Sequence, residues 1–407
     1  MNRPLNGVRV VELATFVAGP SCGRLLADLG AEVIKIEHPK GDSWRLSAKG
    51  YKSGVFTDDH NPVFDLYNSG KTHISLNLKS PEGMDAFHKL METADVFVTN
   101  TRPAALDRLG ISYEQLKERY PQLIYAILLG YGEKGPDAER PAFDTTAFWS
   151  RSGFLRDLTT MSDGEYYPVS PPFGVGDTFT GYLLMGQICA ALYHRKETGK
   201  GDYVRSGLYH NAVFGMGTMN IITQEPNPQQ FPRTRVERGG PGGTYRCSDG
   251  EWVYISVSTI AATFQAMSNA IGQPDLPKDP RFDGWEAFKQ NKAVLYEIIR
   301  DAFLEKPSSY WLEKATEFDI AMTRLNHFSE ICKDEQAWAN GYLENVKFAD
   351  GTVGVMPSSP IEMDSVGQLK TRPAPHVGAD TVAVLQQLGY TQEQIASMRD
   401  SGAVFAG

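Results

Sequence analysis

Short apolar runs alternate with amphipathic helical patterns along residues 8–129. The apolar runs have the length and the β-branched content of buried strands, and they cover residues 8–13, 31–37, 74–78, 96–98 and 123–129. Residues 22–29 repeat apolar side chains at helical spacing, and Ser80 and Pro81 mark the start of another helix. Strands alternating with helices predict an α/β fold with an open, Rossmann-like parallel sheet. Residues 42–70 have neither pattern, which predicts a long loop.

The pattern changes at residues 224–243, which contain four prolines and no helical periodicity. We interpret this segment as a connector. Strand-like runs then flank a turn at residues 248–250, and helical patterns continue to about residue 330, as in a small α+β domain. A capping box at residues 391–394 starts the last helix. The expected organisation is a large domain at 1–223, a linker and small domain at 224–330, and a C-terminal segment at 331–407 that returns to the large domain.

Composition narrows the functional classes. The chain has 407 residues with a formal net charge of −9, so a nucleic-acid partner, which needs a basic face, is not expected. The four cysteines are far apart and form no C-x-x-C pair, which favours free thiols in a reducing compartment. No basic start with a long apolar segment opens the chain, and the near-apolar run at residues 182–193 is too short for a membrane span. We therefore expect a cytoplasmic protein with no membrane partner.

The segment at residues 172–181, PFGVGDTFTG, offers the clearest candidate chemistry. Asp177 lies directly before a long apolar helical pattern. On composition alone it is interpreted as a helix N-cap. The alternative is an exposed carboxylate that stays ionised near the positive end of the helix dipole and acts as a nucleophile. Gly174, Gly176 and Gly181 would let a ligand approach the backbone closely.

Other patterns either exclude chemistry or suggest an anion. The chain lacks the motifs of dinucleotide-binding folds, P-loop kinases and serine hydrolases, and its eight histidines show no metal-ligand spacing, so no metal site is expected. Lys71, Lys79, Arg102 and Arg108 lie near predicted strand ends, where ligands of open parallel sheets bind. They would hold phosphates or, for each taken alone, be ordinary surface charges. The glycines of residues 239–243, GGPGG, fit a flap or a linker.

Several motifs, in order along nearly the whole chain, resemble the class III (family III) coenzyme A-transferases. They are residues 4–42 (PLNGVRVVELATFVAGPSCGRLLADLGAEVIKIEHPKGD), 68–83 (NSGKTHISLNLKSPEG), 94–111 (ADVFVTNTRPAALDRLGI), 174–181 (GVGDTFTG), 191–204 (ALYHRKETGKGDYV) and 375–395 (PHVGADTVAVLQQLGYTQEQI). The resemblance implies that Asp177 is the nucleophile, because the family's aspartate occupies this GD position. It also implies an enzyme with no cofactor beyond coenzyme A or acyl-CoA, its substrate.

The implied reaction passes through two aspartyl intermediates. The Asp177 carboxylate attacks the acyl-CoA thioester to give a mixed anhydride, and the CoA thiolate then forms an aspartyl-CoA thioester and frees the first acid. The incoming acid repeats these steps in reverse. Each addition forms an oxyanion, for which amides of the Phe16–Ala18 turn and the glycine loop are candidates.

The resemblance also implies the CoA contacts and an active-site loop. The implied contacts are Val17 and Ala18 through the backbone, together with His38, Leu76, Lys79, Asn100, Thr101 and Arg108. The implied loop contains Gly239, Gly240, Gly242 and Gly243. His38 stands where some members have an arginine that stacks on adenine, which leaves the details of CoA binding open. Leu129 replaces a lysine of the oxalate enzymes, which argues against oxalate as the acceptor.

Alternatives remain within and beside this family. The related alpha-methylacyl-CoA racemases use a histidine that is replaced here by Phe143, so racemase chemistry is the alternative. Residues 130–154 and 334–343 most resemble transferases for a 2-hydroxy acid and 2-enoyl acid pair, while carnitine-type, bile-acid and dicarboxylate specificities stay open. Phe148, Trp149 and Phe154 either line an acyl pocket or pack in the core. The resemblance further implies an interlocked homodimer, with residues 224–243 and 320–345 crossing between domains.

Overall fold

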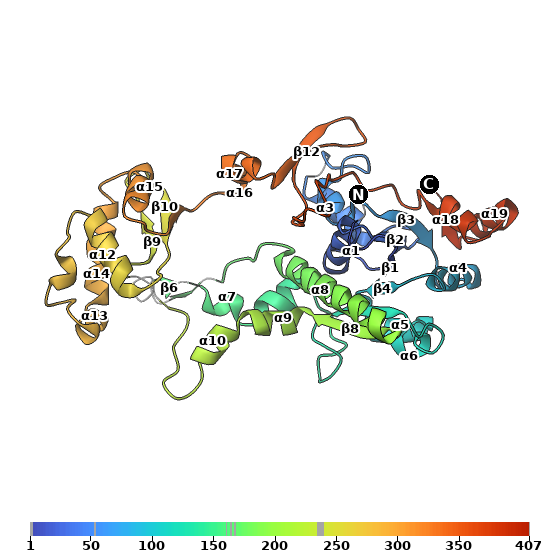
Figure 1. The fold of residues 1–407 in the computed structure, drawn as a ribbon, viewed down its shortest axis with the longest axis horizontal. Coiled ribbons are helices and arrows are strands. Elements are labelled where there is room, and N and C mark those ends of the chain that lie inside the picture. The colour runs from blue at the N-terminus through green and yellow to red at the C-terminus, as the bar shows by residue number, and fades with distance from the viewer. Residues whose placement is uncertain are drawn as a thin grey trace. The chain divides into compact units, whose positions relative to one another are not determined.

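A computed structural model describes residues 3–52, 54–159, 161–162, 165–166, 168–233 and 240–406. The chain forms two compact units, and Figure 1 shows the elements of each. The first unit comprises Met1–Phe154, Pro171–Ile222 and Cys332–Gly407. The second comprises Leu155–Ser170 and Thr223–Ile331.

A seven-stranded sheet forms the centre of the first unit, in the order β14-β3-β2-β1-β4-β5-β8. Its strands are β1 (Arg9–Leu13), β2 (Glu32–Glu37), β3 (Thr72–Leu76), β4 (Val96–Thr99), β5 (Ile124–Leu129), β8 (Asp202–Gly207) and β14 (Val404–Phe405). All neighbours pair in parallel except β14, which is antiparallel to β3. The predicted α/β fold with a mostly parallel sheet is therefore confirmed. The order reverses between β1 and β4, which is where such sheets bind ligands.

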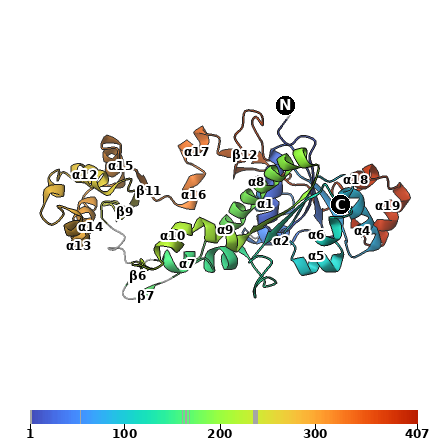
Figure 2. The same cartoon turned by 60° about the horizontal axis from the view of Figure 1, so that its bottom comes forward.

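Helices cover both faces of this sheet because adjacent strand residues point to opposite sides. Val10 belongs to a core shared with α1 (Ala18–Asp28), α8 (Val175–Thr198) and α9 (Leu208–Gly215). Val11, its neighbour, belongs to the core of the other face. The helices of that face are α4 (Pro81–Met91), α5 (Pro103–Leu109), α6 (Tyr113–Leu116), α18 (Thr381–Gln387) and α19 (Gln392–Asp400). Figure 2 shows α1 and α8 side by side.

The predicted loop at residues 42–70 is wrong, because two short helices form there. In α2 (Ser43–Gly50), the Asp42 side chain accepts a hydrogen bond from the amide of Trp44. In α3 (Pro62–Asn68), the Asn61 side chain caps the start and Pro62 fits the first turn. These helices are short and depend on their caps, so their apolar periodicity is weak. The remaining elements of this unit are η1 (Asp144–Ser150), α10 (Gly217–Ile222), α17 (Glu335–Ala339), β12 (Leu343–Lys347) and β13 (Val353–Pro357).

The second unit packs helices around an antiparallel sheet of three strands. The strands are β9 (Gly243–Arg246), β10 (Trp252–Ile255) and β11 (Met322–Arg324), in the order β11-β10-β9. The predicted hairpin around residues 248–250 joins β9 to β10. The helices are α12 (Ile260–Ala270), η2 (Leu276–Lys278), α13 (Trp285–Gln290), α14 (Lys292–Phe303), α15 (Ser308–Glu317) and α16 (Phe328–Ile331). Short strands β6 (Met161–Ser162) and β7 (Glu165–Tyr166) pair with each other, and α7 (Phe154–Asp157) begins at the boundary between the units.

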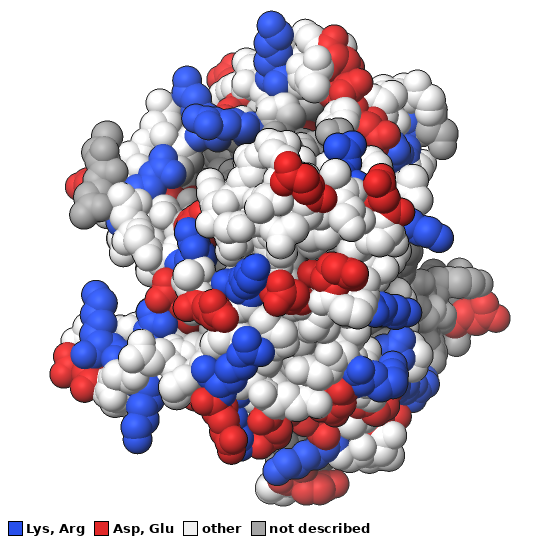
Figure 3. All heavy atoms as spheres, turned by 90° about the vertical axis from the view of Figure 1, so that its right-hand side faces the viewer, with Lys and Arg blue, Asp and Glu red and all other residues white. Residues whose placement is uncertain are grey.

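Charges of both signs are interspersed on the face drawn in Figure 3. Across the described ranges, no helix combines the length and the apolar content that a membrane crossing requires. The same residues contain no group of three or more His, Cys, Asp or Glu side chains placed to hold a metal ion.

Candidate active site

Asp177 lies in the first turn of α8, but it is not the helix cap. Gly174 takes the cap position with φ +77°, which places Asp177 third in the helix. Its side chain is only 8 % exposed, and no described group donates a hydrogen bond to its carboxylate. Burial raises the pKa of Asp177 to about 7, and the nearby charge of Asp144 adds to this rise. The interpretation of Asp177 as the N-cap and the expected exposure of its carboxylate are therefore both wrong.

Asp144 is a second buried carboxylate beside the same helix end. It begins η1, and its Oδ2 accepts a hydrogen bond from the Gly174 amide at 2.9 Å. Its Oδ1 forms no hydrogen bond with a described group, while the nearby amides of Gly176 and Asp177 act to lower the pKa of the carboxyl group. Burial raises the pKa of Asp144. The two carboxylates therefore share one weakly solvated site.

The glycines around Asp177 make room for protein rather than for a ligand. A Cβ atom on Gly176 would lie 2.3 Å from Asp144 Oδ1, and one on Gly181 would lie 2.0 Å from the Ser21 Oγ of α1. Both distances are shorter than any real Cβ contact, so glycine permits the close packing of α8 against η1 and α1. These two glycines therefore serve helix packing and not, as predicted, the close approach of a ligand.

A cavity of about 440 Å³, the aromatic cavity, opens beside the two carboxylates. Trp44 and Phe173 stack with ring centroids 5.1 Å apart, and Tyr51 packs edge-on against both. Phe16 and Phe143 meet edge-to-face at 5.6 Å. The lining comprises Phe16, Trp44, Ser47, Gly50, Tyr51, Phe143, Asp144, Thr145, Phe173 and Asp177. The cavity is therefore apolar except at its carboxylates and a few hydroxyl groups.

A second cavity of about 250 Å³, the strand-end cavity, lies where β1, β4 and β5 end. Thr15, Asn100 and Leu129 line it from these strand ends, and the guanidinium-bearing Arg102 and Arg140 add positive charge. Its position agrees with the reversal of strand order between β1 and β4. Phe16, Phe143 and Asp177 line this cavity as well as the aromatic one. Asp177 is therefore accessible from two cavities, one lined mainly by aromatic rings and the other containing two arginines.

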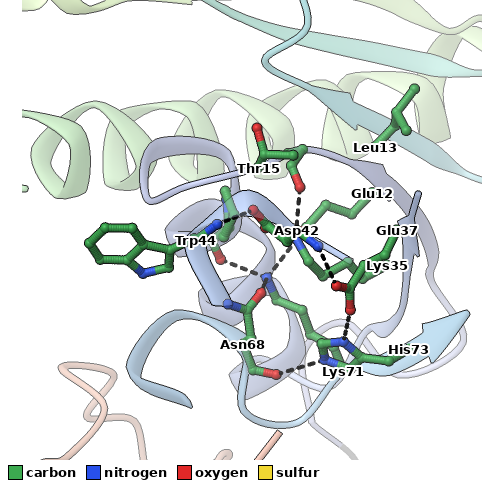
Figure 4. A network of polar contacts seen from close by, with 12 residues as sticks. Glu12, Leu13, Thr15, Lys35, Glu37, Asp42, Trp44, Asn68, Lys71 and His73 are labelled. Carbon is green, nitrogen blue, oxygen red and sulfur yellow. Dashed lines mark hydrogen bonds and ion pairs between the residues drawn. The ribbon is translucent and has the colours of Figure 1, made fainter. Parts of the chain in front are cut away.

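Phe16, which the cavities share, has a constrained backbone. Its φ of +61° is rare for a residue with a side chain, and the Asp42 carboxylate accepts a hydrogen bond from its amide at 3.3 Å. Lys35 lies 3.0 Å from the other oxygen of Asp42 (Figure 4). It also donates a hydrogen bond to the carbonyl of Ala14 at 2.6 Å. Lys35 is fully buried in this position. A buried ion pair therefore ties the Phe16 turn to the end of β1.

Lys71 also belongs to this buried network. Its Nζ donates to Glu12 Oε2 and to the carbonyl of Pro20, both at 2.8 Å, and Glu12 also contacts Lys35. Burial lowers the pKa of Lys71 to about 8, against the opposing effect of Glu12. Because Lys71 is 5 % exposed and fully engaged, the interpretation that it holds a phosphate is wrong.

The CoA contacts implied by the sequence lie in different environments. Ala18 and Asn100 line the strand-end cavity, and the Asn100 amide pairs with the backbone of Thr15 at 3.0 and 2.8 Å. Val17 and Leu76 are buried in hydrophobic cores. The amide of Thr101 donates to Thr99 Oγ1, while the side chains of His38, Lys79 and Arg108 are exposed. Gly240, Gly242 and Gly243 belong to the second unit, and Gly239 lies outside the described residues.

The structure also shows lining residues that the sequence did not reveal. Phe148 is 6 % exposed within the core on the α8 side of the sheet, and Trp149 and Phe154 pack against that core. Neither cavity uses these three side chains. Trp44 and Phe173 line the aromatic cavity instead, and their contact unites segments that are distant in sequence. The only sequence signal was the Asp42 cap, which places Trp44 in the first turn of α2.

Comparison with known proteins assigns the family. The family described as CoA-transferase family III matches residues 5–381. The (R)-2-hydroxy-4-methylpentanoate CoA-transferase of Clostridioides difficile is 38 % identical, over 98 % of this chain and 99 % of its own length. The cinnamoyl-CoA:phenyllactate CoA-transferase of Clostridium sporogenes is 36 % identical, over 97 % of this chain and 95 % of its own.

Solved structures agree with this assignment. A CAIB/BAIF family protein from Brucella suis is 28 % identical with a TM-score of 0.79, over 95 % of this chain and 100 % of its own. Rv3272 of Mycobacterium tuberculosis is 26 % identical with a TM-score of 0.80, over 94 % of this chain and 99 % of its own. This chain therefore belongs to CoA-transferase family III.

Proposed function

We propose that this chain transfers coenzyme A between an acyl-CoA and a free carboxylic acid, with Asp177 as the covalent nucleophile. One observation carries the assignment: of the described titratable residues, Asp177 alone lines both the aromatic and the strand-end cavity. A nucleophile that reacts in turn with CoA and with an acid must be accessible to both.

The transfer occurs in four balanced steps. The Asp177 carboxylate attacks the thioester carbonyl, which forms a mixed anhydride and releases the CoA thiolate. The thiolate attacks the aspartyl carbonyl, which frees the first acid and leaves an aspartyl-CoA thioester. The second acid's carboxylate attacks this thioester, forming a new anhydride and releasing the thiolate again. The thiolate finally attacks the acyl carbonyl of that anhydride, producing the new acyl-CoA and restoring the Asp177 carboxylate.

Backbone amides support the oxyanion that forms in each step. The N–H groups in the first turn of α1 have no acceptor within their helix, and this turn borders the strand-end cavity through Ala18. The first-turn amides of α8 lie at Asp144 instead. The Phe16 amide is excluded from this role because it donates to Asp42. Of the expected Phe16–Ala18 turn, the amides of Val17 and Ala18 remain candidates.

The strand-end cavity suits the CoA substrate. It contains Asn100, Ala18 and the positively charged Arg102 and Arg140, which are appropriate for an anionic ligand. We assign CoA to this side, with the exposed Arg108, Lys79 and His38 as further contacts for its outlying phosphates or adenine.

The acids are proposed to be a 2-hydroxy acid and a 2-enoyl acid, as suggested by relatives named for 2-hydroxy-4-methylpentanoate and for phenyllactate and cinnamoyl-CoA. The related racemases pair a histidine with an acidic residue for proton transfer, and no described histidine lines either cavity. Phe143, at the position of the racemase histidine, carries no proton to transfer.

We also propose a cytoplasmic homodimer whose subunits interlock. Exposed apolar side chains on α8, α9 and α10 support a second copy, including Tyr193, Phe214 and Ile221 at 71, 82 and 68 % exposure. Size-exclusion chromatography with light scattering tests the dimer, and a monomer at micromolar concentration would contradict it.

The nucleophile is tested by trapping. Incubation with acyl-CoA and hydroxylamine, followed by intact-mass and peptide analysis, should show a modification on Asp177 that is lost in Asp177→Asn. Transfer activity with no modification of Asp177 would overturn the mechanism. Exchange of the alpha proton of a 2-methylacyl-CoA without an acceptor acid would favour the racemase alternative.

A further inference from the structure

We propose that the aromatic cavity holds the side chain of the carboxylic acid, and that Phe143 and Phe173 select a branched or aromatic apolar side chain over a second carboxylate. This inference rests on the proposed function, because it assigns the acid to one of the two compartments that meet at Asp177.

Aromatic side chains in the walls of this cavity are more exposed than is usual for a surface without a ligand. Phe143, Phe173 and Tyr51 are 57, 48 and 54 % exposed, although each is aromatic and all gather at one opening. Trp44, by contrast, is 2 % exposed and stacks beneath Phe173. An apolar ligand that covered these rings would remove a large apolar surface from water, which is the main source of affinity in such sites.

The charges in the cavity exclude a second carboxylate. Among the described residues, its charged lining groups are Asp144 and Asp177, and no described Lys or Arg lines it. A dicarboxylic acid with its reacting end at Asp177 would place its other end among rings and beside Asp144, without a cationic partner. The strand-end cavity has Arg102 and Arg140, so of these two cavities it is the one that described arginines line.

The geometry assigns the two selecting residues. Phe143 contacts Phe16 edge-to-face and lines both cavities, so it forms part of the wall between them. Phe173 precedes Gly174, the cap of α8, and stacks on Trp44 at an interplanar angle of 11°. Because both rings are half exposed, their removal should leave the core intact.

The experiment measures kcat/KM for a series of acceptor acids with one common acyl-CoA donor. The series contains 2-hydroxy-4-methylpentanoate, phenyllactate, lactate and malate. Phe143→Ala and Phe173→Ala should lower the ratio of kcat/KM for each bulky apolar acid to kcat/KM for lactate by about tenfold or more. Leu46→Ala is the matched control, since Leu46 lies on α2 with 68 % exposure but does not line the cavity.

A variant that gains activity with malate would distinguish a change in acid selectivity from a general loss of stability. Ser47 is exposed on α2 and lines the cavity, so Ser47→Arg would supply the missing cation. We expect this variant to raise the ratio of kcat/KM for malate over 2-hydroxy-4-methylpentanoate by about tenfold. A merely destabilised variant would lower both values together.

The experiments give different results if only the acid-selectivity proposal fails and if the proposed CoA transfer itself fails. Equal losses for all four acids in both alanine variants, or a wild-type preference for malate, would overturn the inference while aspartyl trapping still succeeded. Failure to trap any adduct and failure to transfer CoA to any acid would overturn the proposed function itself.

Discussion

The aromatic cavity and the strand-end cavity meet at Asp177 and share Phe16 and Phe143, yet they differ in every other recognition group. The first is lined by stacked rings with carboxylates at one end. The second lies at the carboxyl ends of parallel strands and contains two arginines. The difference indicates that recognition of the acid and recognition of CoA are separate, so either can change without altering the nucleophile between them.

The largest expected effect comes from removing the group that both cavities share. Asp177→Asn should lower CoA transfer by more than about 10⁴-fold, because the amide is a poor nucleophile. The fold should be retained, since asparagine has nearly the same shape. Steady-state assays with circular dichroism check both expectations, and near-wild-type turnover would contradict them.

The same variant should be more stable than the wild type above pH 7. The pKa of Asp177 is about 7 when folded, compared with an ordinary value of 3.8, so ionisation between these values weakens the folded state relative to the unfolded one. That loss is complete above pH 7 and absent below pH 3.8. Thermal unfolding at pH 8 and pH 5 should show a larger gain for Asp177→Asn at pH 8, and the reverse order would contradict the buried carboxylate.

Changing the strand-end cavity should affect CoA alone. Arg102→Gln is expected to raise KM for acyl-CoA by about tenfold and to leave the relative preference among acids unchanged, because the arginine lines only that cavity. Arg119→Gln is the control, since Arg119 is exposed and pairs with Glu92 away from both cavities. A changed order of acid preference in Arg102→Gln would show that the compartments are not separate.

The carboxylate pair predicts a pH profile. The first attack needs ionised Asp177, so single-turnover adduct formation should fall as pH drops below about 7, approaching tenfold per unit. Asp144→Asn removes a neighbouring negative charge and keeps an oxygen for the Gly174 amide, so it should move this acid limb to lower pH. A limb that stays in place would show that burial alone sets the pKa of Asp177.

The smallest effect on activity is expected from changing Asp42, which holds the backbone of Phe16 between the two cavities. Asp42→Asn keeps an acceptor for the Phe16 amide but removes the ion pair with Lys35. Lys35 keeps its ion pair with Glu12, so we expect the free energy of unfolding to fall by only about 2 kcal/mol. Activity should fall about two- to fivefold with every acid. Urea unfolding and kinetics measure these changes, and selective loss with one acid would contradict a shared support.

Elements that depend on a local sequence pattern could be predicted, whereas features that depend on contacts between distant residues could not. Strands β1 to β5 were found because buried parallel strands are continuous apolar runs. Strands β8 and β14 were missed, because β8 is half polar and β14 has only two residues. The helices α2 and α3 were missed because their starts depend on the single caps Asp42 and Asn61. Asp177 was identified through its motif, but its raised pKa depends on burial and on Asp144, which is distant in sequence.

The aromatic cavity could not be predicted for a similar reason. Its rings come from Phe16, Trp44, Tyr51, Phe143 and Phe173, and only the fold brings these segments together. The aromatic residues that are neighbours in sequence, Phe148, Trp149 and Phe154, instead pack in or against the core.

Gly176 has a consequence for how such an enzyme diversifies. Any larger residue there would collide with Asp144 and with the ring of Phe148, so this position cannot change without displacing one of the acid pair. Phe143 and Phe173 have no such constraint, because each is open to solvent on one side. Descendants of an ancestral gene could therefore acquire new acids by exchanging these rings one at a time, while the reacting pair was inherited unaltered.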